Sequence, residues 1–468
     1  VQSLVAPEVC QAHRLVLQPE GDQTPRLTPR DFGLVAIGMT VVTFGYFLAD
    51  FGIGAMLIRR PEAPDVDVVE SLLGFQLLAG SVVALVTVAV STSVGGDALV
   101  TAVIVMSLPL LAARAPTGIL LERNLQYRPL VMGEVGETAV YYAFAIATAL
   151  LGWGVWSLAF AALVRSASGT AIVIALAKSR IIRPRLSWRQ TRRLFSFGLQ
   201  YQAVGLTNLV RDQGLNVGVA GLGGVTTLGI WTFANRILQV PFLVFTALWR
   251  VSYPAMSRLI ALGESPAPLI QRALTLGSVA TGLMLVPLAG SAPALVPVLL
   301  GARWQSVAGI LPWPCLGLMV SGPISVAVAG YLYATGNAAA PLRAAVLHTT
   351  VWLGLALPLL PVIGVQAIGY GWLGGCVVDA LVLGRAAARR VPIRISRALA
   401  IPTLTATAAA AVGWRLASSG TANPARLVLA ALIAETIYVL GLLLFNRRAF
   451  LDTLGTTGSA FRTTVARA

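Results

Sequence analysis

The sequence predicts an all-α polytopic membrane protein, and two observations carry that prediction. The first is composition: of 468 residues, 57% are hydrophobic and only 11% are charged, with a mean hydropathy of +0.80. Ordinary soluble domains carry about a quarter charged residues. The second is that apolar runs long enough to cross a bilayer core recur along most of the chain. A soluble globular fold is therefore excluded.

The first apolar run extends from Phe32 to Ala49 and is bounded by Asp31 and Asp50. Eighteen helical residues at 1.5 Å each span roughly 27 Å, about the thickness of one bilayer core. A glycine-containing segment follows and leads to Arg59 and Arg60. The run therefore predicts a transmembrane helix that emerges on a basic, cytoplasmic surface.

Twelve further apolar runs follow, so that about 13 transmembrane helices are predicted. Short loops rich in arginine, glycine or proline separate them, as expected for spans joined at the two membrane surfaces. The predicted ranges are 70–91, 98–117, 130–151, 155–177, 194–222, 228–249, 269–289, 308–334, 342–361, 364–383, 398–416 and 426–445. Prolines interrupt several of these runs, and the LPWPC stretch at 311–315 predicts a discontinuous helix.

The distribution of basic residues predicts the topology. Residues 178–193 contain seven basic side chains in sixteen positions, which assigns this segment to the cytoplasm. Counting alternation outward from it places most other arginines on the same side and makes the C-terminus cytoplasmic. The same count places the tail before Asp31 outside. Because that tail has neither a span nor a signal-peptide core, we expect that a first helix is missing and that an intact relative has fourteen.

The predicted domain organisation follows from these landmarks. We expect an irregular N-terminal tail, a first lobe of helices, a cytoplasmic basic linker, a second lobe, two C-terminal helices and a cytoplasmic tail, over residues 1–30, 31–177, 178–193, 194–390, 391–448 and 449–468. Gly33 opens one helix and Gly229 opens another, 196 residues later. This spacing corresponds to six helices and suggests a parallel repeat, an architecture found in transporters.

Several classes of function are disfavoured. The formal charge of +16 is spread over short loops rather than gathered in one patch, so membrane topology explains it better than nucleic acid does. The chain has two histidines and three widely spaced cysteines, and it contains no metal-ligand spacing, phosphate loop or nucleophile elbow. We therefore expect no metal and no enzyme.

Several stretches, in order and spacing, carry a family resemblance. They include TPRDFGLVAIGMTVV, LADFGIGAMLIRRPE, LERNLQYRPLVMGEV and LVPVLLGARW, with two longer segments at 194–221 and 228–259. Together they resemble the polysaccharide-transporter, or Wzx-like, oligosaccharide flippases of the multidrug/oligosaccharidyl-lipid/polysaccharide (MOP) superfamily. The sequence departs from the family pattern at the N-terminus, where the first of fourteen helices is absent.

The resemblance implies two pseudo-symmetric six-helix lobes around a central cavity, plus two C-terminal helices. It implies that the protein moves an undecaprenyl-phosphate-linked oligosaccharide from the inner to the outer leaflet of a bacterial plasma membrane by alternating access. The implied partners are this lipid-linked substrate, membrane lipids and polysaccharide polymerase machinery. It also leaves open a coupling proton or sodium ion, and no other cofactor.

Ionisable side chains at membrane depth are costly and are candidates for function. Arg211 and Asp212 break the apolar run at 194–222, Arg236 lies near the middle of the run at 228–249, and Arg165 lies midway along the run at 155–177. Arginine suits phosphate oxygens because its planar fork stays charged and binds two oxygens. We expect these residues to line the cavity. For Arg211 and Asp212, the alternative is an ion pair that only holds helices together.

Three carboxylates are further candidates, either for binding a coupling ion or for neutralising arginines. Asp50 ends the first apolar run, where a helix cap is the alternative reading. Glu134 and Glu137 lie early in the run at 130–151. The structural alternative for Arg165 is an ion pair with Glu134 or Glu137 that packs two helices together.

Two rival functions are weighed against the flippase. A cation-coupled multidrug or metabolite exporter of the MATE-like branch would need a carboxylate-based proton or sodium site, whereas we expect few carboxylates but several arginines to be buried at membrane depth, which favours an anionic lipid substrate. A polysaccharide synthase or ligase would need large extracytoplasmic loops with catalytic side chains, and the predicted loops are short. The flippase is therefore preferred.

Overall fold

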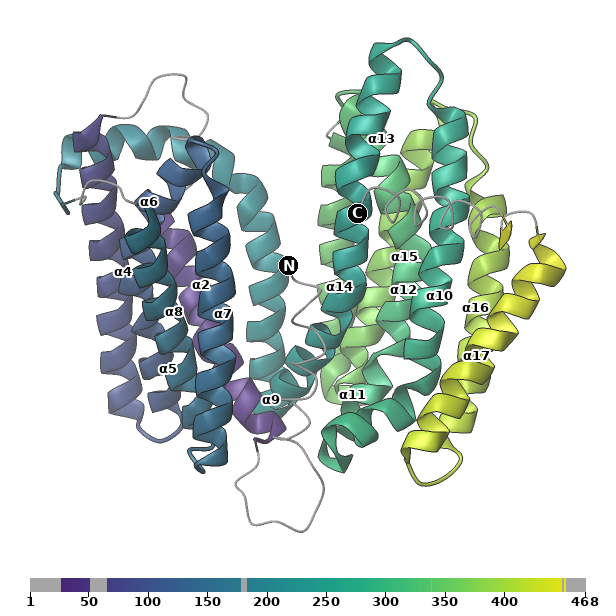
Figure 1. The fold of residues 1–468 in the computed structure, drawn as a ribbon, viewed down its shortest axis with the longest axis horizontal. Helices are drawn as coiled ribbons and strands as arrows, with labels where there is room; N and C mark the ends of the chain where they lie inside the picture. Colours follow the sequence, from purple (N-terminus) through teal and green to yellow (C-terminus); the bar gives the residue numbers. More distant parts are fainter. Residues whose placement is uncertain (1–26, 51–64, 178–182, 338, 448–449, 452–468) are drawn as a thin grey trace. The chain divides into compact units, whose positions relative to one another are not determined.

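The fold was analysed in a computed structural model. It describes residues 27–50, 65–177, 183–337, 339–447 and 450–451; the predicted tails at 1–30 and 449–468 thus lie almost wholly outside the described residues. All regular structure in the described part of the chain is helical (Figure 1). The prediction of an all-α polytopic protein is confirmed.

Within the described residues, twelve helical stretches are long and apolar enough to cross a membrane. The thirteen predicted spans correspond to them with one difference. A loop was expected between residues 222 and 228, whereas helix α9 (Trp188–Ala261) continues through this region and is broken only at Gly224. Gly224 has a φ of 79°, a backbone conformation that glycine adopts without strain. The two predicted spans are therefore two helical segments of α9 that meet directly at the kink at Gly224, without the expected loop.

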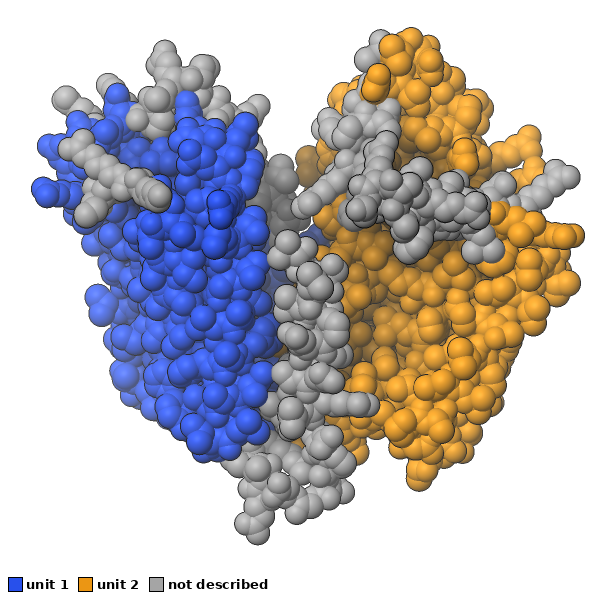
Figure 2. Space-filling model, in the orientation of Figure 1, with its two compact units in different colours: residues 1–229 blue, residues 230–468 orange. Residues whose placement is uncertain are grey.

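The chain divides into two compact units, residues 1–229 and 230–468 (Figure 2). Unit 1 contains α2, α4, α5, α6, α7, α8 and the first part of α9. The bounds before α9 are Pro29–Asp50, Val66–Val94, Ala98–Val105, Ser107–Arg123, Tyr127–Leu150 and Val155–Ala177. This division does not fall at the predicted basic linker 178–193, and the predicted lobes and their boundaries stay a prediction.

Helix α2 begins where a capping box satisfies the first backbone donors of the helix. The amide and hydroxyl of Thr28 donate to a carboxylate oxygen of Asp31 at 2.7 and 2.8 Å, and the Asp31 amide donates back to the Thr28 hydroxyl at 3.4 Å. This reciprocal arrangement stabilises a helix start. It explains why the helix begins three residues before the first apolar residue of the run.

Unit 2 contains the rest of α9 and the helices α10, η2, α11, α12, η3, α13, α14, α15, α16 and α17. Their bounds are Ala267–Leu300, Ala302–Trp304, Gln305–Ile310, Pro312–Ile324, Ser325–Ala329, Gly330–Ala334, Ala339–Ile363, Gln366–Ala388, Ile395–Ser418 and Pro424–Phe445. Helix α10 extends beyond its predicted end at residue 289 despite Pro293 and Pro297. Prolines are tolerated in membrane helices when neighbouring helices satisfy the freed carbonyls.

The discontinuity predicted at 311–315 is limited to the hydrogen-bond pattern, because Leu311 keeps helical dihedrals (φ −54°, ψ −40°). α11 ends at Ile310 and α12 begins at Pro312, with Leu311 between them. After Pro323 the chain continues as a π-helical segment, Ser325–Ala329, before α13. Proline removes a backbone donor and so favours such a widened turn.

Candidate functional site

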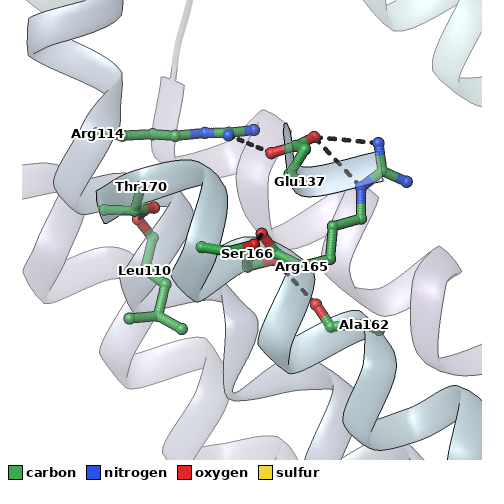
Figure 3. A network of polar contacts seen from close by, with 8 residues as sticks. Leu110, Arg114, Glu137, Ala162, Arg165, Ser166 and Thr170 are labelled. Carbon is green, nitrogen blue, oxygen red and sulfur yellow. Dashed lines mark hydrogen bonds and ion pairs between the residues drawn. The ribbon is translucent and has the colours of Figure 1, made fainter. Parts of the chain in front are cut away.

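The interior of unit 1 holds a three-residue ion cluster built from successive spans. The Glu137 carboxylate on α7 accepts hydrogen bonds from Arg114 on α6 and from Arg165 on α8 (Figure 3). Arg114 Nη1 lies 2.5 Å from Glu137 Oε2, whereas Arg165 Nη2 and Nε lie 3.0 and 3.2 Å from Glu137 Oε1. Each carboxylate oxygen therefore binds one guanidinium.

Glycines allow the cluster to form against the backbone of α8. A β-carbon at Gly169 would overlap the Glu137 carboxylate and would lie 2.6 Å from Arg114 Nη1. On α7, β-carbons at Gly133 and Gly136 would lie 2.5 and 2.6 Å from side-chain atoms of Val173 and Ile172 on α8. Small residues are the usual means by which membrane helices approach closely.

Hydroxyl groups join the same helices around the cluster. Thr170 on α8 donates to the carbonyl of Leu110 on α6 at 2.8 Å, and Ser166 donates to the carbonyl of Ala162 one turn earlier (Figure 3). The Arg165 guanidinium also lies 5.9 Å from the ring centroid of Tyr141, within the range of a cation–π interaction. α6, α7 and α8 are thus fixed to one another where the charges lie.

The three side chains differ in exposure. Glu137 is buried, with its side chain only 5% exposed, whereas the side chains of Arg114 and Arg165 are 26% and 42% exposed. Glu137 and Arg165 lie near the middle of α7 and α8, and Arg114 lies more than two turns inside the span Ala98–Arg123. Two arginines and one carboxylate leave one net positive charge at membrane depth. Such a group is expensive in lipid and marks a functional or buried polar site.

The structure resolves the alternatives for Glu134 and Glu137. Glu137 forms the ion pair with Arg165, and Glu134, three residues earlier on α7, is exposed. The structural alternative noted for Arg165 is thus present, but Arg165 keeps a large exposed fraction. Asp50 is half-buried at the last residue of α2.

Arg211 and Asp212 pair with each other rather than with another helix. Arg211 Nε lies 2.7 Å from Asp212 Oδ1, and Arg211 Nη2 lies 3.2 Å from Asp212 Oδ2; both side chains are partly exposed on α9. Arg236 lies exposed on α9 beyond Gly229, in unit 2. The structure therefore brings Arg165 and Glu137 together and leaves the other predicted candidates outside this cluster.

Sequence reasoning missed three charged residues at membrane depth. Arg114 completes the cluster, although it lies inside the predicted span 98–117 and meets the criterion applied to Arg165. In unit 2, Asp379 on α15 accepts a 3.4 Å hydrogen bond from Ser325 in the π-helical segment, and Glu435 on α17 has a buried carboxylate oxygen. The described residues hold no group of three or more metal-ligating side chains.

Comparison with solved structures defines the class of protein. The fold is similar to that of lipid II flippase MurJ in an inward closed conformation, with a TM-score of 0.69, 14% identity and coverage of 96% of this chain and 99% of that one. It is also similar to an inward-facing multidrug resistance MATE family transporter of the MOP superfamily, with a TM-score of 0.57, 14% identity and coverage of 84% and 95%. The chain therefore shares the multi-pass helical fold of these two proteins.

The sequence then gives the family. Residues 26–309, more than half of the chain, match the family described as polysaccharide biosynthesis protein, and the chain belongs to that family. The succinoglycan biosynthesis transport protein ExoT of Rhizobium meliloti (strain 1021) is 26% identical over 382 residues, covering 76% of this chain and 70% of that protein. The chain therefore belongs to a polysaccharide biosynthesis family, and the relative and the structural neighbours named here are transporters and flippases rather than enzymes, as the resemblance implied.

Proposed function

We propose that this protein carries an undecaprenyl-phosphate-linked oligosaccharide from the inner to the outer leaflet of a bacterial plasma membrane by alternating access. The observation that carries the proposal is the cationic cluster inside unit 1. A lipid-linked saccharide carries its negative charge on phosphate oxygens, and a site at membrane depth must compensate that charge while the headgroup crosses. Arg114 and Arg165 provide this compensation.

The geometry of the two guanidiniums suits phosphate. A guanidinium has five N–H donors, and the bonds to Glu137 use two from Arg165 and one from Arg114. Both side chains are also partly exposed. Further donors can therefore bind phosphate oxygens in the paired geometry that arginine favours. Arg211 and Arg236 on α9 are proposed as secondary contacts along the substrate path.

The proposal is tested by complementing a bacterial strain that lacks its lipid-linked oligosaccharide flippase. Arg114→Gln and Arg165→Gln keep hydrogen-bonding capacity but remove the charge, and each is expected to lower surface polysaccharide and to accumulate lipid-linked intermediate in the inner leaflet. Arg30→Gln, which removes an exposed cation far from the cluster, is the matched control. Full export by both cluster variants at normal protein level contradicts the proposal.

The second candidate function is cation-coupled export of a drug or metabolite. The half-buried carboxylates of unit 2 favour it, because Asp379 with the Ser325 hydroxyl offers oxygen ligands to a coupling proton or sodium ion. This function predicts that cells expressing the protein accumulate less of a cationic dye and that Asp379→Asn abolishes the effect. Dye export without any change in lipid-linked intermediate favours the exporter over the flippase.

A further inference from the structure

Glu137 occupies the position that an anionic substrate group would take beside Arg114 and Arg165. It binds both guanidiniums from the buried side, since its own side chain is 5% exposed and theirs are 26% and 42% exposed. A phosphate arriving from the exposed side therefore meets two cations that an internal anion already holds. Protein and substrate anions compete for the same donors.

Resting on the proposed function, we propose that Glu137 is an exchangeable counter-anion that releases the guanidiniums to substrate phosphate and takes them back when substrate leaves. Two uncompensated guanidiniums inside a membrane protein would be strongly destabilising, so the empty site needs an anion of its own. The same anion weakens substrate binding and thereby speeds release. Glu137 is in this sense a positioning residue that favours substrates carrying more than one negative charge.

The test uses the full chain purified into lipid nanodiscs, with undecaprenyl diphosphate as the probe. Glu137→Gln removes the competing charge and keeps the side-chain shape, so we expect affinity for the probe to rise about tenfold while transport of a fluorescent lipid-linked saccharide in proteoliposomes slows. Glu134→Gln, on the same helix and exposed, is the matched control and should change neither. A purely structural role for Glu137 predicts weaker binding instead.

A second pair of variants keeps the proposal testable if Glu137→Gln does not fold. Glu137→Asp retains the charge and should retain wild-type affinity. Glu137→Gln combined with Arg165→Gln restores the net charge of the wild-type cluster, one positive charge, and should be stable with affinity near wild type. Unchanged or reduced affinity in folded Glu137→Gln overturns the exchange. If the wild-type protein itself does not bind undecaprenyl diphosphate, the proposed substrate fails rather than the exchange.

An independent observation concerns Gly33 on α2 and Gly229 on α9. A β-carbon at Gly33 would overlap the carbonyl oxygen of Val225, and a β-carbon at Gly229 would overlap the carbonyl oxygen of Pro29. Each glycine thus contacts the residue four positions before the other. Both corresponding pairs, Gly33 with Gly229 and Pro29 with Val225, are 196 residues apart. Reciprocal contacts of this kind are the signature of a two-fold relation.

The crossing lies beside the break in α9. Gly224 directly precedes Val225, and before the break Asn216 donates a 3.4 Å hydrogen bond to Thr40 on α2. α2 therefore contacts α9 on both sides of Gly224. A change in the bend at Gly224 must disturb one of these contacts, and a single hydrogen bond yields more easily than close backbone packing of two glycines.

We infer that the Gly33–Gly229 crossing is a pivot about which α9 bends at Gly224 while the Thr40–Asn216 hydrogen bond opens and closes. The two glycines allow the helices to rotate against each other at backbone distance. The device belongs to the proposed transport cycle, but its geometry can be measured without any substrate.

Spin labels placed at Val135→Cys on α7 and Val240→Cys on α9, both exposed positions, report the bend by pulsed electron resonance. Cys10 is replaced by serine, and Cys315 and Cys376 are buried. We expect a broad distribution of label-to-label distances in the otherwise unchanged protein. Gly33→Ala and Gly229→Ala should reduce it to one narrow peak, and Thr40→Val should change the relative populations of the distances. Gly221→Ala, on the same helix with nothing within 4 Å of its β-carbon, is the control. Unchanged distributions in both glycine variants overturn the pivot.

Discussion

The interiors of the two units are stabilised by different chemistry. Unit 1 buries a carboxylate between two arginines on α6, α7 and α8. Unit 2 instead gathers Trp231, Trp352 and Trp372, whose ring centroids lie 4.5 to 6.0 Å apart. The contrast teaches that two helical units of one chain can be stabilised by different kinds of interaction. A charged cluster suits a polar headgroup that must be held and released, and packed aromatic rings suit a rigid support.

The largest expected effect is on transport by unit 1. Arg114→Gln combined with Arg165→Gln removes two charge-assisted contacts, and with hydrogen bonds to charged groups contributing about 1.5–3 kcal/mol each, the transport rate should fall at least about 100-fold. The rate is measured with a fluorescent lipid-linked saccharide in proteoliposomes. Trp352→Phe, a change in the aromatic cluster of unit 2, should leave the rate per folded molecule within a few fold. Equal losses in both variants would remove the contrast between the units.

The next effect is on stability. Glu137→Leu leaves the guanidiniums of Arg114 and Arg165 without their buried counter-charge, which should lower the free energy of unfolding by about 3–5 kcal/mol. Thermal unfolding of the detergent-solubilised protein, followed by tryptophan fluorescence, measures the change. Glu134→Leu on the exposed side of α7 should have little effect. A stable Glu137→Leu protein would show that the cluster does not hold unit 1 together.

In unit 2 the expected stability effect comes from packing rather than charge. A β-carbon at Gly282 on α10 would overlap the ring of Tyr438 on α17, so Gly282→Ala should cost about 1–3 kcal/mol through overpacking. Adding Tyr438→Leu frees the space and should recover part of the loss. A double-mutant cycle followed by thermal unfolding measures the coupling, and strict additivity of the two changes would contradict the contact.

The smallest expected effect lies at the surface of unit 1. Arg30 and Asp97 form an ion pair in which both side chains are more than half exposed. Exposed pairs contribute about 0–1 kcal/mol, so Arg30→Ala should shift the unfolding transition only slightly, and less at high salt. A shift comparable to that of Glu137→Leu would mean that exposure does not separate the two kinds of ion pair.

Much of the fold could be predicted from the sequence, because apolar runs and arginine-rich loops record the membrane directly. The predicted spans fall on the observed helices, and the interruption of the helical hydrogen bonds near Leu311 follows from the neighbouring prolines. The glycines at 221, 223 and 224 marked the junction between two helices correctly, but the connection is a kink at the single non-helical residue Gly224 rather than a loop. A glycine pattern alone does not distinguish a kink from a loop.

The candidate site was only half predictable. The chance that Arg165 pairs with Glu134 or Glu137 was visible, because both lie in adjacent spans. Which glutamate points inward depends on the rotation of α7, and this rotation is fixed by Gly133 and Gly136 packing on α8. Arg114 could have been identified, because it lies within the predicted span 98–117 and meets the criterion that was applied to Arg165. Its partner lies 23 residues away, beyond any local pattern.

The ion cluster also has a consequence for how the chain is made. Arg114 is synthesised before its partner, so α6 meets the membrane with an unneutralised cation, which costs about 2.5–3.5 kcal/mol at the centre of an inserting helix. Only when α7 follows does Glu137 compensate it, and α8 then adds Arg165. These three spans therefore depend on one another during biogenesis. If synthesis stops after α6, that helix should insert inefficiently into the membrane, whereas in the complete protein Glu137 compensates its charge.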